Sequence, residues 1–411
     1  MADYAGEHGL MARRFRIAHV ARCLILAASF GATCAADAAL PRPDPDGLLI
    51  AVYKDLAASR LQDAMAKANA LVKAYPNFQL GHLIRGDLLL MQTRKVERLG
   101  AVDGAPPDAL DNLREEAAAR LKALYERPNP DAVPRAVLQL RRDQKNVLVV
   151  DASRSRLYVY ENRGGELHFA RDFYISQGKL GVDKRKEGDG KTPLGVYYIT
   201  SRLAGARLPD FYGTGALPIS YPNEWDRLHG RDGYGIWLHG TPASNYSRPP
   251  LSSDGCVVLT NPDLNQLYAS VEVGKTPVVI SRQMQFVSRK QLATERDAFA
   301  AVIEKWRGDV ESLDAQRLRG NYSSSFRSDH GEDADAWLSR FGQDLLRRPG
   351  AVKLTVRDMS LFLYPGQDNL MVATFTQDAA IGKFRRSTRR RQYWAREGAS
   401  WKIVSESAWQ S

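Results

Sequence analysis

Cysteine is scarce in this sequence, and the scarcity limits the chemistry open to the chain. Its 411 residues contain three cysteines, and Cys23 and Cys34 fall in an N-terminal stretch that we expect to be removed. A framework of disulfide bonds is thereby excluded, and Cys256 remains as a single thiol. An inert, buried cysteine is the ordinary alternative. We favour a reactive thiol, because Cys256 directly follows Gly255 and lies seventeen positions after His239.

Long hydrophobic runs are also missing. The longest apolar stretch near the N-terminus, residues 23–30, is far shorter than the roughly 20 residues that cross a bilayer. Arginines precede it and an Ala-x-Ala site follows at residues 36–38, which is typical of a cleaved signal peptide. We therefore predict a signal over residues 1–38, export to the periplasm and no integral membrane segment in the mature protein. A lipoprotein interpretation of Cys34 is less favoured, because Thr33 precedes it.

Motifs for metals and cofactors are absent from the sequence. There is no His-Glu-x-x-His, no paired Cys-x-x-Cys and no glycine-rich phosphate loop. The histidines after residue 100 are scattered: His168, His229, His239 and His330. We predict neither a metal nor a cofactor.

The charge balance is strongly basic, with a formal net charge of +11 and a pI near 9.5. A basic surface favours anionic polymers, and an exported protein meets the cell envelope rather than nucleic acid. Residues 383–394 mix arginines with aromatics, as nucleic-acid binders do. We interpret that segment instead as a strand edge that its charges protect from pairing, and we predict no nucleic-acid partner.

The length predicts two or three domains. Apolar residues recur at three- and four-residue intervals in the first segment, which predicts a helical module over residues 40–143. It resembles tetratricopeptide-like hairpins, and such a module packs or recruits, so a homodimer or a partner protein is possible through it.

Short strands with Gly and Pro turns predict a mainly-β domain over residues 144–283. A helix at 295–312, a second at 334–346 and then five strands predict an α+β cone over residues 293–411. Their order resembles the nuclear-transport-factor-2-like fold, which often encloses a pocket and carries many unrelated functions.

The chemistry concentrates in the middle domain. A thiol attacks a carbonyl as the thiolate, so Cys256 needs a base, and His239 at the end of an apolar strand is the candidate. The Gly240 carbonyl is the nearest group that could orient the imidazole. The amides of Gly255 and Cys256 could form an oxyanion hole. Ser253 is expected to bond within the turn or to bind substrate.

Two neighbouring features leave alternatives open. His229 is a rival base, although it follows a polar loop rather than a strand. Asp254 beside the thiol would raise its pKa unless a cation balances it, and Arg248 and Arg231 are the candidates.

Three ordered motifs resemble the L,D-transpeptidase catalytic domain of the YkuD type. They are Thr-Pro-x-Gly-x-Tyr at 192–197, His-Gly at 239–240 and Ser-x-Gly-Cys at 253–256. Residues 221–226 and 233–237 look like the branch of the family found in Gram-negative bacteria. The resemblance implies acyl transfer on peptidoglycan stem peptides, with Cys256 attacking the carbonyl that precedes a terminal D-amino acid. Ser253, Tyr234, Trp237 and Arg248 are the candidate substrate-binding residues.

This chain departs from the family pattern at two positions. Val258 stands where many members have Arg or Asn, so the function of that polar group must come from elsewhere. Asp254 replaces the common His or Arg.

The acyl acceptor is left open by the sequence. An amine gives a cross-link, a lipoprotein lysine gives attachment, and water gives L,D-carboxypeptidase trimming. We place transpeptidation first. The three-part domain order resembles carboxypeptidases that set helical cell shape, which is the alternative. A domain that only binds the cell wall is the third possibility.

Overall fold

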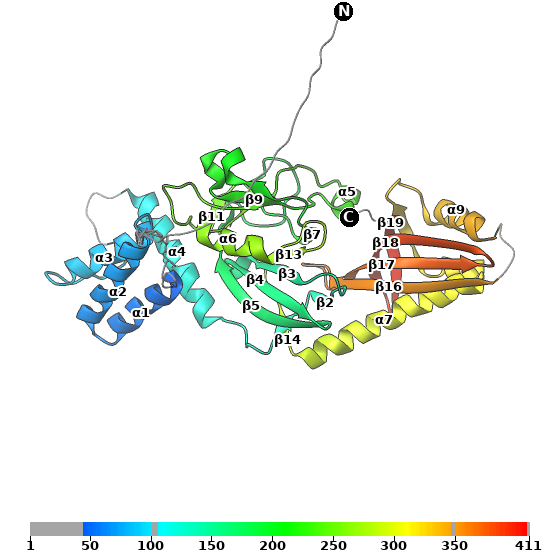
Figure 1. The fold of residues 1–411 in the computed structure, drawn as a ribbon, viewed down its shortest axis with the longest axis horizontal. Helices are drawn as coiled ribbons and strands as arrows, with labels where there is room; N and C mark the ends of the chain where they lie inside the picture. The colour runs from blue at the N-terminus through cyan, green and yellow to red at the C-terminus, as the bar shows by residue number, and fades with distance from the viewer. Residues whose placement is uncertain (1–43, 101–105, 347–350, 409–411) are drawn as a thin grey trace, which may run out of the picture. The chain divides into compact units, whose positions relative to one another are not determined.

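The computed structural model describes residues 44–100, 106–346 and 351–408 (Figure 1). The expected signal over residues 1–38, with Cys23 and Cys34, lies outside the described residues. Within those ranges no helix combines the length and the apolar character that a membrane crossing requires.

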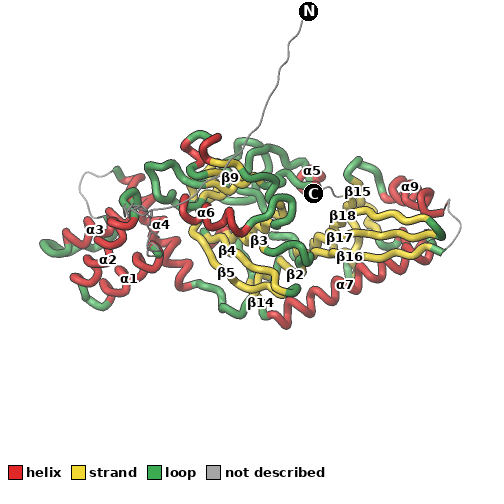
Figure 2. The backbone as a smooth tube through the Cα atoms, in the orientation of Figure 1, coloured by secondary structure: helices red, strands yellow, loops and turns green. Residues whose placement is uncertain are grey.

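Four helices form the N-terminal module, and Figure 2 shows them in red with the labels α1 to α4. They are α1 (Pro45–Ala57), α2 (Leu61–Ala74), α3 (Gln79–Leu90) and α4 (Pro107–Tyr125). Asp44 begins α1 by accepting hydrogen bonds from the Asp46 and Gly47 amides, and Pro45 fits the first turn. The expected apolar spacing buries one face of each helix in a shared core that includes Leu49, Leu71 and Leu88.

The helical pattern ends earlier than the sequence suggested. After Tyr125 the chain forms β1 (Val133–Pro134) and β2 (Val137–Gln139). β1 pairs with β14 (Phe286–Val287), and β2 pairs with β16 of the C-terminal sheet. The strands arise because prolines at 128, 130 and 134 prevent a further helix.

Two sheets build the middle domain. One has the order β5-β4-β3-β13-β7 and the other β12-β10-β9-β8. The first contains β3 (Asn146–Asp151), β4 (Arg156–Arg163), β5 (Glu166–Tyr174), β7 (Gly195–Tyr198) and β13 (Pro277–Ser281). The second contains β8 (Leu203–Ala204), β9 (Gly215–Pro218), β10 (Trp237–His239) and β12 (Val257–Val258). The expected hairpin is present as β3 paired with β4.

Smaller elements complete this domain. β6 (Gln177–Gly178) pairs with β11 (Leu251–Ser253). The two α-helices are α5 (Glu224–Leu228) and α6 (Asn261–Ser270). Three short 3₁₀ turns lie at Ala152–Arg154, Gly205–Arg207 and Asp210–Tyr212. Inward-facing residues of both sheets form one core, as the alternation of the short strands predicts.

The C-terminal domain packs helices on a six-stranded sheet of order β15-β19-β18-β17-β16-β2 (Figure 1). Its helices are α7 (Arg289–Ser312), α8 (Ala315–Arg319) and α9 (Ala334–Leu346). Its strands are β15 (Tyr322–Ser328), β16 (Val352–Leu363), β17 (Leu370–Ile381), β18 (Phe384–Glu397) and β19 (Ser400–Ala408). Of the five strands expected in this domain, the sequence predicts the first two at 352–356 and 360–364; the structure has one strand there, β16, with an irregularity between Arg357 and Ser360.

The prediction of an unpaired strand edge at residues 383–394 is wrong for the residues from 390 onward. β18 pairs with β17 along its whole length, and from Arg390 onward it also pairs with β19. Arg391 is only 1% exposed. The charges misled the prediction because a buried arginine with a carboxylate partner looks, in sequence, like an exposed one.

Candidate active site

Neighbouring parallel strands bring Cys256 and His239 to one side of a sheet. β10 pairs with β12 so that Leu238 lies opposite Val257 and His239 opposite Val258. Cys256 directly precedes β12, two residues before Val258. Since side chains alternate along a strand, Cys256 lies diagonally across from His239 on the same face.

The His239 imidazole is buried and fixed in one tautomer. Its Nδ1 lies 2.7 Å from the Gly240 carbonyl oxygen, and because a carbonyl can only accept, Nδ1 carries the proton. Nε2 is therefore the basic nitrogen. Burial lowers the pKa of His239 to about 4, so the ring is neutral at physiological pH. The rings of Phe211 and Tyr212 pack against it with centroids 5.6 and 5.1 Å away.

The Cys256 thiol is also neutral in the resting site. Its Sγ lies 3.4 Å from the Gly235 carbonyl oxygen, and its hydrogen bonds do not include His239. Burial raises the pKa of Cys256, while the Trp237 amide and the charge of Arg248 act in the opposite direction. The resting pair is thus a thiol and an imidazole rather than a thiolate and an imidazolium.

Hydrogen bonds hold the turn that presents Cys256. The Ser253 hydroxyl donates to the Cys256 carbonyl at 2.6 Å and accepts from the Gly255 amide at 3.1 Å. Thr192 donates to the Gly255 carbonyl at 2.9 Å and accepts from the Gly178 amide at 2.9 Å. Gly255 has φ +129°, and a Cβ there would lie 2.6 Å from the Lys191 carbonyl oxygen, so the turn requires glycine.

These bonds revise two expectations from the sequence. The Gly255 amide donates to Ser253, so of the two amides expected to form an oxyanion hole the Cys256 amide remains the candidate. Ser253 serves the turn, as the first of its two expected roles requires. The sequence assigned no role to Thr192 of the Thr-Pro-x-Gly-x-Tyr motif. In the structure its hydroxyl donates to the Gly255 carbonyl and so fixes the turn before Cys256.

The Gly240 backbone lies very close to the Asn261 side chain, a contact that the sequence did not predict. A Cβ at Gly240 would lie 2.1 Å from Asn261 Oδ1, and the same oxygen accepts from the Thr214 and Thr241 amides. Asn261 is the first residue of α6, directly after the N-cap Thr260. This local sequence signal predicts the start of a helix, but it does not predict the contact of Asn261 with the His-Gly segment.

The two candidate cations behave differently. Arg248 lies over the Phe211 ring at 4.4 Å, and its charge acts on both His239 and Cys256. Arg231 instead pairs with Asp226 at 3.3 Å and with Asp183 at 3.5 Å, so its proposed role beside Asp254 is wrong. The direct partner of Asp254 is Lys179, at 2.7 Å.

The remaining candidates separate in the same way. His229 packs against Trp225 with ring centroids 4.0 Å apart and an interplanar angle of 43°, and its Nδ1 lies 2.9 Å from the Trp225 carbonyl oxygen, so its described contacts are with α5. Trp237 is half-buried with its ring 4.8 Å from Tyr212. Tyr234 is 76% exposed.

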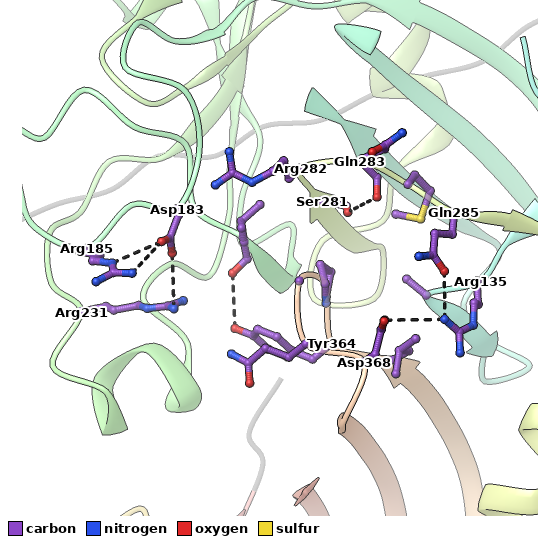
Figure 3. A pocket seen from close by; sticks show the side chains of 17 residues that line it. Arg135, Asp183, Arg185, Arg231, Ser281, Arg282, Gln283, Gln285, Tyr364 and Asp368 are labelled. Carbon is purple, nitrogen blue, oxygen red and sulfur yellow. Dashed lines mark hydrogen bonds and ion pairs between the residues drawn. The ribbon is translucent and has the colours of Figure 1, made fainter. Parts of the chain in front are cut away.

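Two cavities have walls that do not include Cys256. One, of about 550 Å³, has walls that include Arg135, Arg282 and Tyr364, and Figure 3 shows Arg185 and Arg231 both directed at Asp183 beside it. The other, of about 640 Å³, has walls that include Tyr198 and Arg391. In the described ranges, no group of three or more His, Cys, Asp or Glu side chains could hold a metal ion.

Comparison with known families matches two segments of the chain. Residues 145–280 match YkuD, the L,D-transpeptidase catalytic domain, and residues 298–407 match the Cds6 C-terminal NTF2-like domain. Neither match covers the helical module.

Individual relatives agree with these matches. YafK of Escherichia coli strain K12, described as an L,D-transpeptidase, is 31% identical over 117 residues, which are 28% of this chain. That segment spans 42% of YafK, so less than half of the relative's length is matched. Bd1075 of Bdellovibrio bacteriovorus is 26% identical, with a TM-score of 0.60 over 68% of this chain and 99% of its own.

A third relative shares the fold. Pgp2 of Campylobacter jejuni, a helical cell shape determining protein, is 22% identical, with a TM-score of 0.55 over 67% of this chain and 95% of its own. The chain thus contains a segment that matches the YkuD L,D-transpeptidase catalytic domain, between an N-terminal helical region and a segment that matches the Cds6 C-terminal NTF2-like domain.

Proposed function

We propose that this protein is a cysteine-dependent L,D-transpeptidase that acts on peptidoglycan stem peptides in the periplasm. The observation that carries the proposal is the tautomer of His239. Its Nδ1–H is committed to the Gly240 carbonyl, which leaves Nε2 as a base on the sheet face that also bears the protein's one described thiol.

The reaction follows from these positions. His239 Nε2 takes the Cys256 proton as Sγ attacks the carbonyl carbon before the terminal D-residue. The Cys256 amide faces the developing oxyanion. The imidazolium then returns the proton to the leaving amine as the C–N bond breaks, and a thioester remains. An acceptor amine attacks the thioester carbon, loses its proton to His239 and releases the thiol.

Arg248 is the proposed replacement for the polar group that Val258 lacks. Its guanidinium lies on Phe211, next to His239, and its charge reaches both the thiol and the imidazole. An arginine in that position suits the terminal carboxylate of the D-residue. Tyr234 and Trp237 lie five and two positions before His239, and they are proposed to line the peptide groove.

L,D-carboxypeptidase activity is the second candidate. The matches to Bd1075 and Pgp2 cover 68% and 67% of this chain, more than the catalytic domain alone, and the name of Pgp2 concerns cell shape. In that case water resolves the thioester and a tetrapeptide stem becomes a tripeptide.

Product analysis separates these functions. The full chain and its Cys256→Ala variant are incubated with disaccharide-tetrapeptide muropeptides, and the products are identified by mass spectrometry. Dimeric 3→3 products that disappear in the variant support transpeptidation. Tripeptide monomers alone support the carboxypeptidase, and muropeptide binding without any product, equal in both proteins, supports a wall-binding domain.

A further inference from the structure

The helical module contacts the segment that connects His239 to Cys256. We name residues 241–250 the module loop. Its Tyr246 is 5% exposed and inserts between two rings of the module, Tyr75 and Phe78, with centroids 4.7 and 4.8 Å away. Tyr246 therefore belongs to the core of the helical module, although its backbone belongs to the catalytic domain.

Polar contacts fix the backbone of the module loop. The Tyr246 amide donates to the Asn77 carbonyl at 3.2 Å, and Asn77 Nδ2 donates to the Ala243 carbonyl at 3.1 Å. The Ser247 hydroxyl donates at 2.6 Å to Glu116, a buried carboxylate of α4. The module thus bonds the module loop at three residues, Ala243, Tyr246 and Ser247.

Arg248 follows these contacts directly. Its carbonyl accepts a hydrogen bond from the Tyr174 hydroxyl at 2.9 Å, and Arg120 of α4 lies 3.9 Å above the Tyr174 ring. The Arg248 guanidinium projects in the other direction, onto Phe211 beside His239. The Arg248 backbone is therefore linked to the module through Tyr174 and Arg120, while its charge acts in the catalytic site.

We infer that the helical module is a working part of the active site, in which Tyr246 positions Arg248 so that its guanidinium binds the carboxylate of the substrate's terminal residue. Tyr246 is a positioning residue, because it touches neither the thiol nor the imidazole. The identity of the peptide rests on the proposed function, whereas the placement of a carboxylate-binding cation beside Cys256 does not.

Alkylation of Cys256 tests the inference without any peptide. Iodoacetate and iodoacetamide both transfer a carbon to the thiolate sulfur with loss of iodide, but only iodoacetate carries a carboxylate. Arg248→Gln should lower the iodoacetate-to-iodoacetamide rate ratio by about tenfold, the factor for one charge-assisted hydrogen bond of about 1.4 kcal/mol. Tyr246→Ala should lower the ratio in the same direction, and Tyr246→Phe, which keeps the ring, should restore it.

Two further variants control for general loosening. Leu49→Ala opens a cavity in the same core but leaves the module loop intact, so the ratio should stay at the wild-type value. Asn77→Ala removes one contact with the loop and little packing, so it tests the inference even if Tyr246→Ala fails to fold. It should lower the ratio by about threefold, as for one net hydrogen bond.

The outcomes are distinct. An unchanged ratio in Tyr246→Phe and Leu49→Ala together with a lower one in Tyr246→Ala or Asn77→Ala supports the inference. A wild-type ratio in both Tyr246→Ala and Asn77→Ala, or an equal fall in Leu49→Ala, overturns the positioning role. A wild-type ratio in Arg248→Gln overturns the assignment of Arg248.

Substrate kinetics add the link to peptides. The wild-type enzyme should prefer a tetrapeptide with a free carboxylate over its C-terminal amide, and Tyr246→Ala should lose that preference mainly through a higher KM. Absence of turnover by the wild type on either peptide would contradict the proposed function, while the alkylation ratios would still decide the inference.

Discussion

The helical module and the C-terminal domain both contact the catalytic domain, but they hold different parts of its site. The module holds the loop that carries Arg248, through Tyr246, Asn77 and Glu116. The C-terminal domain instead contacts α5 and the segment before β7. The module therefore supports the residue proposed to bind the substrate's charge, and the C-terminal domain contacts the segment that includes Thr192, which bonds the turn before Cys256.

The contact of the C-terminal domain centres on Glu224. This carboxylate accepts from Arg391 at 3.1 Å and from the Tyr393 hydroxyl at 3.2 Å, and the adjacent Trp225 stacks on Tyr393 with centroids 5.3 Å apart. Tyr364 lies against Gly195, where a Cβ would come within 2.7 Å of its hydroxyl oxygen. The residues just before Gly195 include Thr192, which holds the Gly255 carbonyl.

The largest expected effect is on the C-terminal contact. Glu224→Ala leaves the buried Arg391 guanidinium without its carboxylate and should cost about 3 kcal/mol of unfolding free energy. Calorimetric or denaturant unfolding measures it, with Glu304→Ala, which breaks an exposed ion pair with Arg307, as the control. Equal losses of unfolding free energy in the two variants would mean that the Glu224 contact is no stronger than an exposed ion pair. A lower iodoacetate-to-iodoacetamide ratio in Glu224→Ala would contradict the proposal that the module, and not the C-terminal domain, positions Arg248.

The matching change on the other side is Asp46→Asn. Asp46 bonds Arg120 of α4 and, at 2.8 Å, Arg156 of β4, and these two cations lower the pKa of its carboxyl. Neutralising it should cost about 2 kcal/mol, the scale of hydrogen bonds to a charged group.

Unlike Glu224→Ala, Asp46→Asn should also lower the alkylation ratio, because Asp46 pairs with Arg120, which packs on the Tyr174 ring whose hydroxyl donates to the Arg248 carbonyl. Asp111→Asn, at an exposed pair with Arg114, is the matched control. If Asp46→Asn weakened stability and left the ratio unchanged, the module would act as a support only.

A smaller effect is expected inside the nucleophile's turn. Thr192→Val removes the hydroxyl that links the Gly178 amide to the Gly255 carbonyl, which should cost about 2 kcal/mol and lower kcat more than it raises KM. Thr200→Val, at an exposed hydroxyl of the same domain, should do neither. A pure KM effect in Thr192→Val would mean that the turn binds substrate rather than placing the thiol.

The smallest effect is expected from pH. Because the pKa of His239 is lowered to about 4 and that of Cys256 is raised, the thiol and imidazole keep their protonation states across the neutral range. kcat/KM should therefore change little between pH 6 and pH 8 and fall only as the pH drops toward about 4, where Nε2 gains a proton. A midpoint near pH 6.5 on the acid side would contradict the buried, neutral imidazole.

The proposal of Cys256 and His239 as a reacting pair came from local patterns in the sequence. A lone thiol after glycine and a histidine at the end of an apolar strand are both local features, and the positive φ of Gly255 explains the glycine. The carbonyl of Gly240 as the orienting group was also expected, since it is the next residue in the chain.

Contacts between distant segments could not be predicted. The pairing of β2 with β16, the position of β18 and the bond from Glu224 to Arg391 join residues far apart in sequence, and no local period encodes a partner. Lys179 and Asn261 were missed for the same reason. The Gly255 amide, one of the two donors expected for an oxyanion hole, donates instead to the Ser253 side chain, and the Cys256 amide stays a prediction.

The most direct test of the account is the intact mass of the full chain quenched during reaction with a tetrapeptide muropeptide. The account predicts a transient adduct equal to the muropeptide less its terminal D-residue, located on Cys256 by peptide mapping and absent from Cys256→Ala. An adduct on another residue, or product formation by Cys256→Ala, would contradict it.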